Sequence, residues 1–182
     1  MSANVKHLTS IVVLNYNAGD LLLNCIESVY KTQTHKFEVI VVDNISTDSS
    51  HKKCKEKFPQ IRLIENKENL GYCEGNNVGI RNANGEFIVI LNPDTKVESN
   101  WLEELFNAYE KFGDGLYQPK IIAFEDNLFE SGGNMLQMFG FGYSKGRGMP
   151  DLGQFDESGE IGYASGACLF TKTNILKKIG LF

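Results

Sequence analysis

An apolar run that ends in a carboxylate and an amide, FEVIVVDN at residues 37–44, decides the fold class of this chain. Its uninterrupted apolar stretch, residues 39–42, predicts a strand buried on both faces, as in a parallel sheet. The run FIVILNPD at residues 87–94 has the same form, because polar residues follow an apolar strand at once. Two such runs, separated by segments of helical period, indicate an α/β fold built from βαβ units.

The remainder of residues 1–122 continues the alternation of strands and helices. Strands are predicted at residues 10–14, 37–42, 61–65, 87–91 and 116–122. Helices are predicted at residues 20–31, 48–58, 73–82 and 101–112. This order predicts an open, mostly parallel central sheet flanked by helices.

The pattern changes after residue 122. Residues 125–162 hold nine of the 18 glycines and little periodicity, so a long loop region with one hairpin is predicted there. Residues 163–170 then predict a returning strand, and residues 173–179 predict a short terminal helix. The function of the loop region stays open, between a cover over the site and a mobile segment.

Composition excludes several classes of protein. A chain of 182 residues with net charge −5 suits one soluble domain, and its acidic balance argues against nucleic acid as a partner. The four cysteines form no C-x-x-C pair, so neither zinc nor redox chemistry is indicated, and reduced thiols suit the cytoplasm. No apolar stretch is long enough for a transmembrane segment.

Polar side chains follow the predicted strands, where parallel sheets bind their ligands. Asn15 and Tyr16 follow the first strand, Asp43 the second, and Asn92 and Asp94 the fourth. Neither G-x-G-x-x-G nor a P-loop is present, so glycine-rich backbone cannot cradle a diphosphate here. A divalent cation held by a carboxylate would neutralise it instead. We expect Asp43 and Asp94 at adjacent ends of the sheet, facing one crevice.

Six further strings, taken in order, identify a family. They are VLNYN at 13–17, ESV at 27–29, VVDNISTDS at 41–49, ENLGY at 68–72, GNNVGI at 75–80 and LNPDT at 91–95, and SGACLF at 165–170 extends the series. Together they resemble glycosyltransferase family 2, and within it the rhamnosyltransferase-type branch. The resemblance implies the Rossmann-like GT-A fold of nucleotide-diphospho-sugar transferases. It also implies that residues 1–122 form the sugar-nucleotide-binding half and residues 123–182 part of the acceptor side of the same domain.

The resemblance assigns donor contacts by position. Asn15 and Tyr16 would line the base pocket, and Asp43 would accept hydrogen bonds from the base. The third predicted helix would bring Asn76, Asn77 and Arg81 to the nucleotide and sugar.

The metal and the acceptor side are implied in the same way. Asp94 matches the last aspartate of the family's D-x-D motif and would coordinate Mg²⁺ or Mn²⁺ on the diphosphate. Asn92 replaces the first aspartate and would meet the ribose. The acceptor-side strand would contain Ser165, Gly166 and Ala167.

The implied reaction is a metal-dependent, inverting transfer of a sugar, with rhamnose a candidate, from a dTDP- or UDP-sugar to a glycan or lipid-linked acceptor. In the family the general base follows the position where this chain ends, so it is expected after Phe182, and this polypeptide is expected to bind donor but transfer sugar poorly. A peripheral place at the inner face of the membrane stays open for the full-length protein.

Alternatives remain at several points. Asp43 and Asp94 could simply cap turns. A nucleotidyltransferase-like enzyme would want a Gly/Arg/Lys-rich signature after the first strand, which is absent, whereas a non-catalytic sugar-nucleotide-binding module stays open. Three aromatic residues fit an edge strand, an acceptor platform or a homodimer contact equally well: Phe139, Phe141 and Tyr143. The histidines His7, His35 and His51 are predicted to be solvated.

Overall fold

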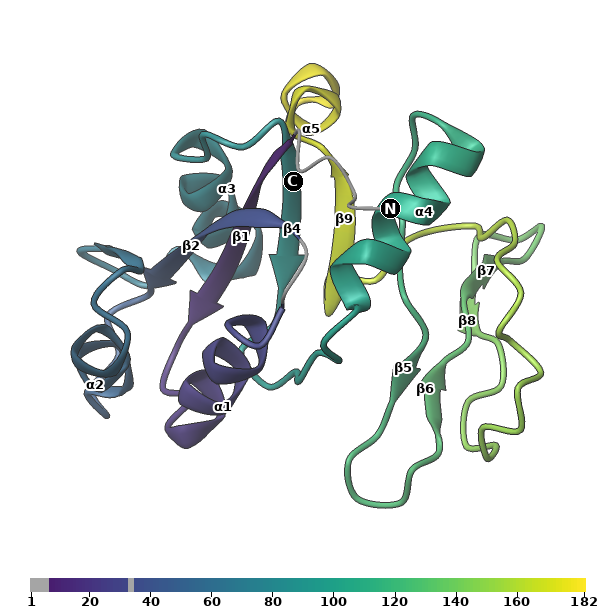
Figure 1. Ribbon diagram of the computed structural model, residues 1–182, viewed down its shortest axis with the longest axis horizontal. Helices are drawn as coiled ribbons and strands as arrows, with labels where there is room; N and C mark the ends of the chain where they lie inside the picture. Colours follow the sequence, from purple (N-terminus) through teal and green to yellow (C-terminus); the bar gives the residue numbers. More distant parts are fainter. Residues whose placement is uncertain (1–6, 33–34) are drawn as a thin grey trace.

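A twisted central sheet of five strands organises the protein (Figure 1). The computed structural model describes residues 7–32 and 35–182. The strands follow the order β3-β2-β1-β4-β9, in which β9 is antiparallel to β4 and the other pairs are parallel. Their bounds are β1 Leu8–Asn15, β2 Lys36–Asp43, β3 Arg62–Glu65, β4 Phe87–Leu91 and β9 Cys168–Lys172. The predicted mostly parallel α/β sheet is confirmed.

Helices cover both faces of this sheet (Figure 1). Their bounds are α1 Asp20–Val29, α2 Ser50–Lys57, α3 Gly71–Arg81, α4 Trp101–Phe112 and α5 Thr173–Ile179. One core cluster joins the sheet to α1, α2 and α4, and a second joins it to α3 and α5. None of these helices, in the part of the chain that the structure describes, has the length and apolar character needed to cross a membrane.

Alternate residues of each central strand serve the two cores, because successive side chains of a strand point to opposite faces. In β1, Val13 packs in the cluster of α1 and α4, whereas Val12 packs in the cluster of α3 and α5. In β2, Val41 and Ile40 divide in the same way. An uninterrupted apolar run is therefore what a strand covered on both faces requires.

Helix α3 lies unusually close to β1, and this closeness depends on glycine. A Cβ atom at Gly79 would lie 2.3 Å from Cγ1 of Val12, whose side chain is fully buried. Gly79→Ala should lower the free energy of unfolding by about 1–3 kcal/mol, because overpacking outweighs alanine's better helix propensity. Urea unfolding measures this difference.

A matched control for that substitution lies on the surface. Gly159 has no positive φ, and a Cβ atom there would meet nothing within 4 Å. Gly159→Ala should change the free energy of unfolding by less than about 0.5 kcal/mol. Equal stability of the Gly79→Ala and Gly159→Ala variants would show that α3 is not held against β1 by this close contact.

Residues 121–144 form two hairpins beside the sheet, where one hairpin was predicted (Figure 1). The first pairs β5, Ile121–Ile122, with β6, Phe129–Ser131. The second pairs β7, Asn134–Leu136, with β8, Gly142–Ser144. The glycine-rich composition predicted loops here. The sequence analysis missed these strands because each is too short to show an alternation of apolar and polar residues.

Two predicted strands are wrong in their bounds. Residues 116–122 do not form a strand of the central sheet. Tyr117 instead makes a single bridge to Phe170, with N···O distances of 2.8 and 2.9 Å, and Pro119, which has no N–H, interrupts the run before β5. The returning strand predicted at 163–170 begins only at Cys168, because residues 166–167 form a turn.

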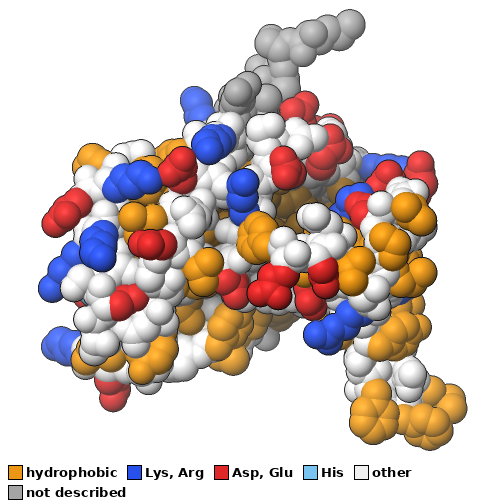
Figure 2. Space-filling view, turned by 90° about the horizontal axis from the view of Figure 1, so that it is seen from below, with side chains coloured by type: hydrophobic (Ala, Val, Ile, Leu, Met, Phe, Trp, Pro, Cys, Tyr) orange, Lys and Arg blue, Asp and Glu red, His pale blue; other side chains and the backbone are white. Residues whose placement is uncertain are grey.

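The connection between β7 and β8 is strongly apolar and exposed. Met138 is 91% exposed, Phe139 80% and Phe141 71%. Figure 2 shows a projecting group of apolar side chains at the end of the molecule that holds the hairpins. Tyr143 lies within β8, so the edge-strand interpretation holds for this residue. The acceptor platform and the homodimer contact stay predictions.

Candidate active site

The carboxyl ends of the parallel strands border a pocket of about 290 Å³. Figure 2 views the molecule from this side, toward which the arrows of β1 and β4 point in Figure 1. The pocket is lined by Leu14, Tyr16, Asn44, Asn69, Gly71, Tyr72, Asn92, Pro93 and Asp94. Ligand pockets usually hold roughly 300–1,000 Å³, so this one suits part of a nucleotide sugar.

Asp43 and Asp94 lie at the same edge of the sheet, as expected, but not on adjacent strands. Asp43 ends β2 and Asp94 follows β4, and β1 lies between these two strands. The expectation of adjacent strand ends is therefore wrong. Sequence order alone does not specify strand order. The strand order runs β3-β2-β1 and then turns to β4, so the reversal that opens a crevice in such sheets lies between β1 and β4.

Asp43 is the centre of a buried polar cluster rather than part of the pocket wall. Its side chain is 2% exposed. Oδ1 accepts a hydrogen bond from Nδ2 of Asn15 at 2.7 Å, and Oδ2 accepts one from the Ser46 N–H at 2.9 Å. The bond to Ser46 caps a turn, so the capping interpretation holds for Asp43. Ser50 Oγ lies 2.9 Å from Nδ2 of Asn15 in the same cluster.

His51 also belongs to this cluster, contrary to its predicted solvation. Its side chain is 4% exposed, with Nδ1 at 3.4 Å from Oδ1 of Asp43 and Nε2 at 3.4 Å from Oε1 of Glu65. The buried residues Cys54 and Phe58 follow it by three and seven positions. Those spacings place all three side chains on one helical face, a signal that the sequence analysis missed.

Asp94 differs from Asp43 in being exposed and free. No described residue forms an ion pair or hydrogen bond with its carboxylate, so the turn-capping interpretation has no support here. The backbone around it is ordered by a turn in which the Thr95 hydroxyl donates to the Asn92 carbonyl at 2.6 Å. A rigid turn thus presents one unneutralised carboxylate to the pocket.

The predicted donor contacts on α3 do not line the pocket. Arg81 forms an ion pair with Glu74. Asn77 donates to the carbonyl of Phe182 at 3.2 Å and accepts from its N–H at 3.1 Å. Asn76 donates to the Tyr72 carbonyl, while its own buried Oδ1 has no partner in the described residues. Of these three, only Asn76 has a buried polar atom without a partner among the described residues.

The predicted acceptor-side residues lie against the pocket loops. Ala167 accepts a hydrogen bond from the Asn92 N–H at 3.0 Å, and Gly166 accepts one from the Tyr72 hydroxyl at 2.8 Å. The Ser165 N–H donates to Oε1 of Gln118 at 2.6 Å. Segment 165–167 therefore lies behind Tyr72 and Asn92, two of the residues that line the pocket.

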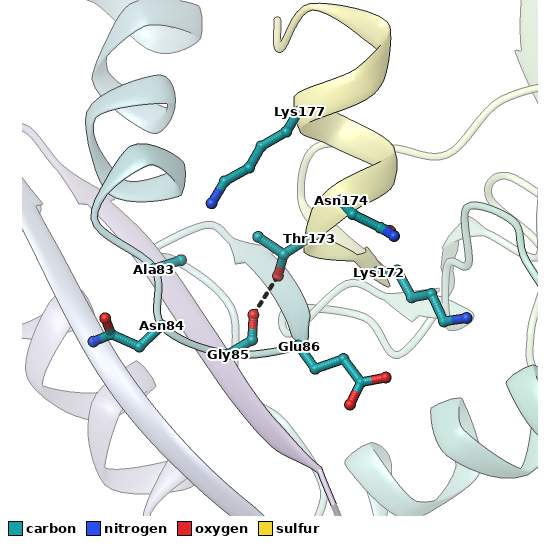
Figure 3. A pocket seen from close by; sticks show the side chains of 8 residues that line it. All are labelled: Ala83, Asn84, Gly85, Glu86, Lys172, Thr173, Asn174 and Lys177. Atoms are coloured by element: carbon teal, nitrogen blue, oxygen red, sulfur yellow. Dashed lines mark hydrogen bonds between the residues drawn. The ribbon is translucent and has the colours of Figure 1, made fainter.

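A second pocket, of about 320 Å³, lies at the opposite end of β4 (Figure 3). Gly85 and Glu86 precede β4, and the Thr173 hydroxyl donates to the Gly85 carbonyl at 2.7 Å. Although slightly larger, this pocket contains none of the predicted site residues. It also lies at the amino ends of the parallel strands, away from the edge that binds ligands in such folds.

Comparison with known proteins identifies the family. The sequence model described as Glycosyl transferase family 2 matches residues 10–180. The chain belongs to this family.

Curated relatives of the chain are named as glycosyltransferases. The chain is 34% identical over 134 residues to glycosyltransferase GlyG of Streptococcus pneumoniae serotype 4, covering 71% of the chain and 43% of the relative. It is 25% identical over 180 residues to the low-salt glycan biosynthesis hexosyltransferase Agl10 of Haloferax volcanii, covering 94% and 54%. The chain thus spans about half the length of these relatives.

Solved glycosyltransferase structures share the GT-A fold of this chain. Mannosyltransferase PcManGT from Pyrobaculum calidifontis, in complex with GDP-Man and Mn²⁺, superposes with a TM-score of 0.69 at 18% identity, covering 98% of this chain and 48% of that one. S. aureus TarS in complex with UDP-GlcNAc superposes with a TM-score of 0.67 at 20% identity, covering 94% and 47%. At these identities the likeness shows the fold.

The side chains at the pocket fit a divalent cation that shares its ligands with a substrate. Among the described residues, no group of three or more His, Cys, Asp or Glu is placed to hold a metal by itself. Mg²⁺ typically takes one or two carboxylates and completes its shell with phosphates and water. The single free carboxylate of Asp94 satisfies that requirement.

Proposed function

We propose that this chain binds the donor of an inverting, metal-dependent glycosyltransferase that uses a dTDP- or UDP-sugar, with rhamnose a candidate sugar, and a glycan or lipid-linked acceptor. The observation that carries the proposal is the free carboxylate of Asp94 beside a pocket at the carboxyl edge of the sheet. A binding edge of this kind, in a chain of this family, suits an activated sugar.

In this proposal different residues at the site bind different parts of the donor. Tyr16, which is 55% exposed, offers its ring to the base at one end of the pocket. Asp43 is proposed to accept a base N–H from behind the pocket wall, where each of its oxygens already accepts one bond within the protein. Asn92 lies beside Asp94 on the same turn and meets the ribose.

Asp94 would hold Mg²⁺ or Mn²⁺ against the diphosphate. When bound, the cation supplies Lewis-acid neutralisation of the charge that develops on the leaving diphosphate. Segment 165–167, which contacts the pocket residues Tyr72 and Asn92, would face the acceptor.

Calorimetric titration tests the proposal. UDP, dTDP and GDP are each titrated into the chain with MnCl₂ and again with excess chelator. We expect UDP or dTDP to bind, and to bind at least about tenfold more weakly in chelator, because phosphate charge then lies unneutralised beside Asp94. Absence of binding by both UDP and dTDP would refute the proposal, and binding of GDP alone would contradict the proposed donor.

A further inference from the structure

Tyr72 joins the two sides of the crevice. It lies in the first turn of α3, where its ring lines the pocket together with Asp94. Its hydroxyl reaches across to segment 165–167 and donates to the Gly166 carbonyl at 2.8 Å. The residue as a whole is 42% exposed, so the ring presents surface to a ligand while its tip is anchored.

Gly166 makes this contact possible through its small size. A Cβ atom at Gly166 would lie 2.2 Å from the Tyr72 hydroxyl oxygen and 3.0 Å from Cζ. Gly166 is not among the residues with positive φ, so the backbone does not itself demand glycine. Any larger residue at position 166 would occupy the space that the Tyr72 hydroxyl fills.

The transferred sugar must lie between the diphosphate and the acceptor. In the proposed function, which this inference rests on, Asp94 holds the diphosphate and segment 165–167 faces the acceptor. Tyr72 lines the pocket together with Asp94, and its hydroxyl contacts segment 165–167. We propose that Tyr72 is a specificity-determining residue, whose ring forms the wall of the subsite for the donor sugar.

The chemistry of the ring suits this position. A tyrosine ring offers an apolar face that packs against the C–H face of a hexose, and its polar tip takes a hydrogen bond. Burial raises the pKa of Tyr72 to about 12. The hydroxyl therefore keeps its proton at neutral pH and continues to donate to Gly166, which holds the ring in one orientation.

The test measures how much the sugar adds to nucleotide binding. UDP, dTDP and GDP are compared with UDP-glucose, dTDP-glucose and GDP-mannose in MnCl₂, and the sugar increment is the Kd of the diphosphate divided by that of its conjugate. Tyr72→Ala should lower this increment about tenfold and change diphosphate affinity less than about twofold. Gly166→Ala, which displaces the hydroxyl, should lower the increment in the same direction.

Two further variants separate this role from general damage. Tyr72→Phe keeps the ring and should leave the increment within about threefold of wild type. Tyr16→Ala lies at the base end and should weaken diphosphates and conjugates equally, leaving the increment unchanged. If diphosphates still bound and the increment were unchanged in both Tyr72→Ala and Gly166→Ala, the role of Tyr72 would be overturned. The proposed function would stand. Failure of every diphosphate to bind wild type would overturn the proposed function as well.

Discussion

Asp94→Ala removes the metal-dependent part of nucleotide binding. In MnCl₂ the affinity for a nucleoside diphosphate should decrease by about 10- to 100-fold, since one charged interaction contributes roughly 1.5–3 kcal/mol. In chelator the variant should bind at least as tightly as the wild type, because removal of the carboxylate also removes its repulsion of the diphosphate. The carboxylate has no partner among the described residues, so stability should be unaffected. Calorimetry with and without MnCl₂ gives both values.

Glu98→Ala is the matched control for Asp94. Glu98 is an exposed carboxylate on the same connection between β4 and α4, but it does not line the pocket. Its removal should leave nucleotide affinity within about twofold of wild type in either condition. If both substitutions weakened binding equally in MnCl₂, the effect would be one of overall charge, and Asp94 would lose its assignment as the metal ligand.

Asp43→Ala should act differently, by weakening binding and destabilising the fold together. Removal of the buried carboxylate leaves the Ser46 N–H without its acceptor, at a cost of about 1–3 kcal/mol, and takes from the Asn15 amide one of its three acceptors. Nucleotide affinity should decrease by a similar factor with and without MnCl₂, because Asp43 is not assigned to the metal. Urea unfolding and calorimetry measure the two effects.

Asp43→Asn keeps the size of the side chain and one acceptor oxygen, so it isolates the loss of charge. We expect its stability to lie between those of wild type and Asp43→Ala, because its amide places N–H groups toward one of the two donors. Wild-type stability in Asp43→Ala would show that the cluster with Asn15 and His51 does not depend on this carboxylate.

The sequence predicted the sheet well where strands are fully buried. Residues 39–42 and 87–91 are continuous apolar runs because helices cover both of their faces, and both strands form at the predicted place. The prediction failed at 116–122, where the apolar residues Ile121 and Ile122 belong to a hairpin outside the central sheet. An apolar run indicates that a segment is buried, but it does not indicate which sheet a short strand joins.

The candidate site was predictable in its location but not in its layout. The ends of apolar strands identified Tyr16, Asn92 and Asp94, which the structure brings together at one pocket. The positions of Asn77 and Arg81 depend on the rotation of α3 and on their partners Phe182 and Glu74. Such contacts span distant parts of the chain or a whole helix surface, and local sequence carries little information about them.

The antiparallel pairing of β9 with β4 has a consequence for synthesis on the ribosome. Strands β1 to β4 all lie within the first half of the chain, whereas Cys168, the first residue of β9, is made much later. Until then the backbone N–H and C=O groups along one side of β4 have no strand beside them. Unpaired edges of this kind invite intermolecular association during folding. The nascent protein is therefore most vulnerable to aggregation while the hairpin region is being translated.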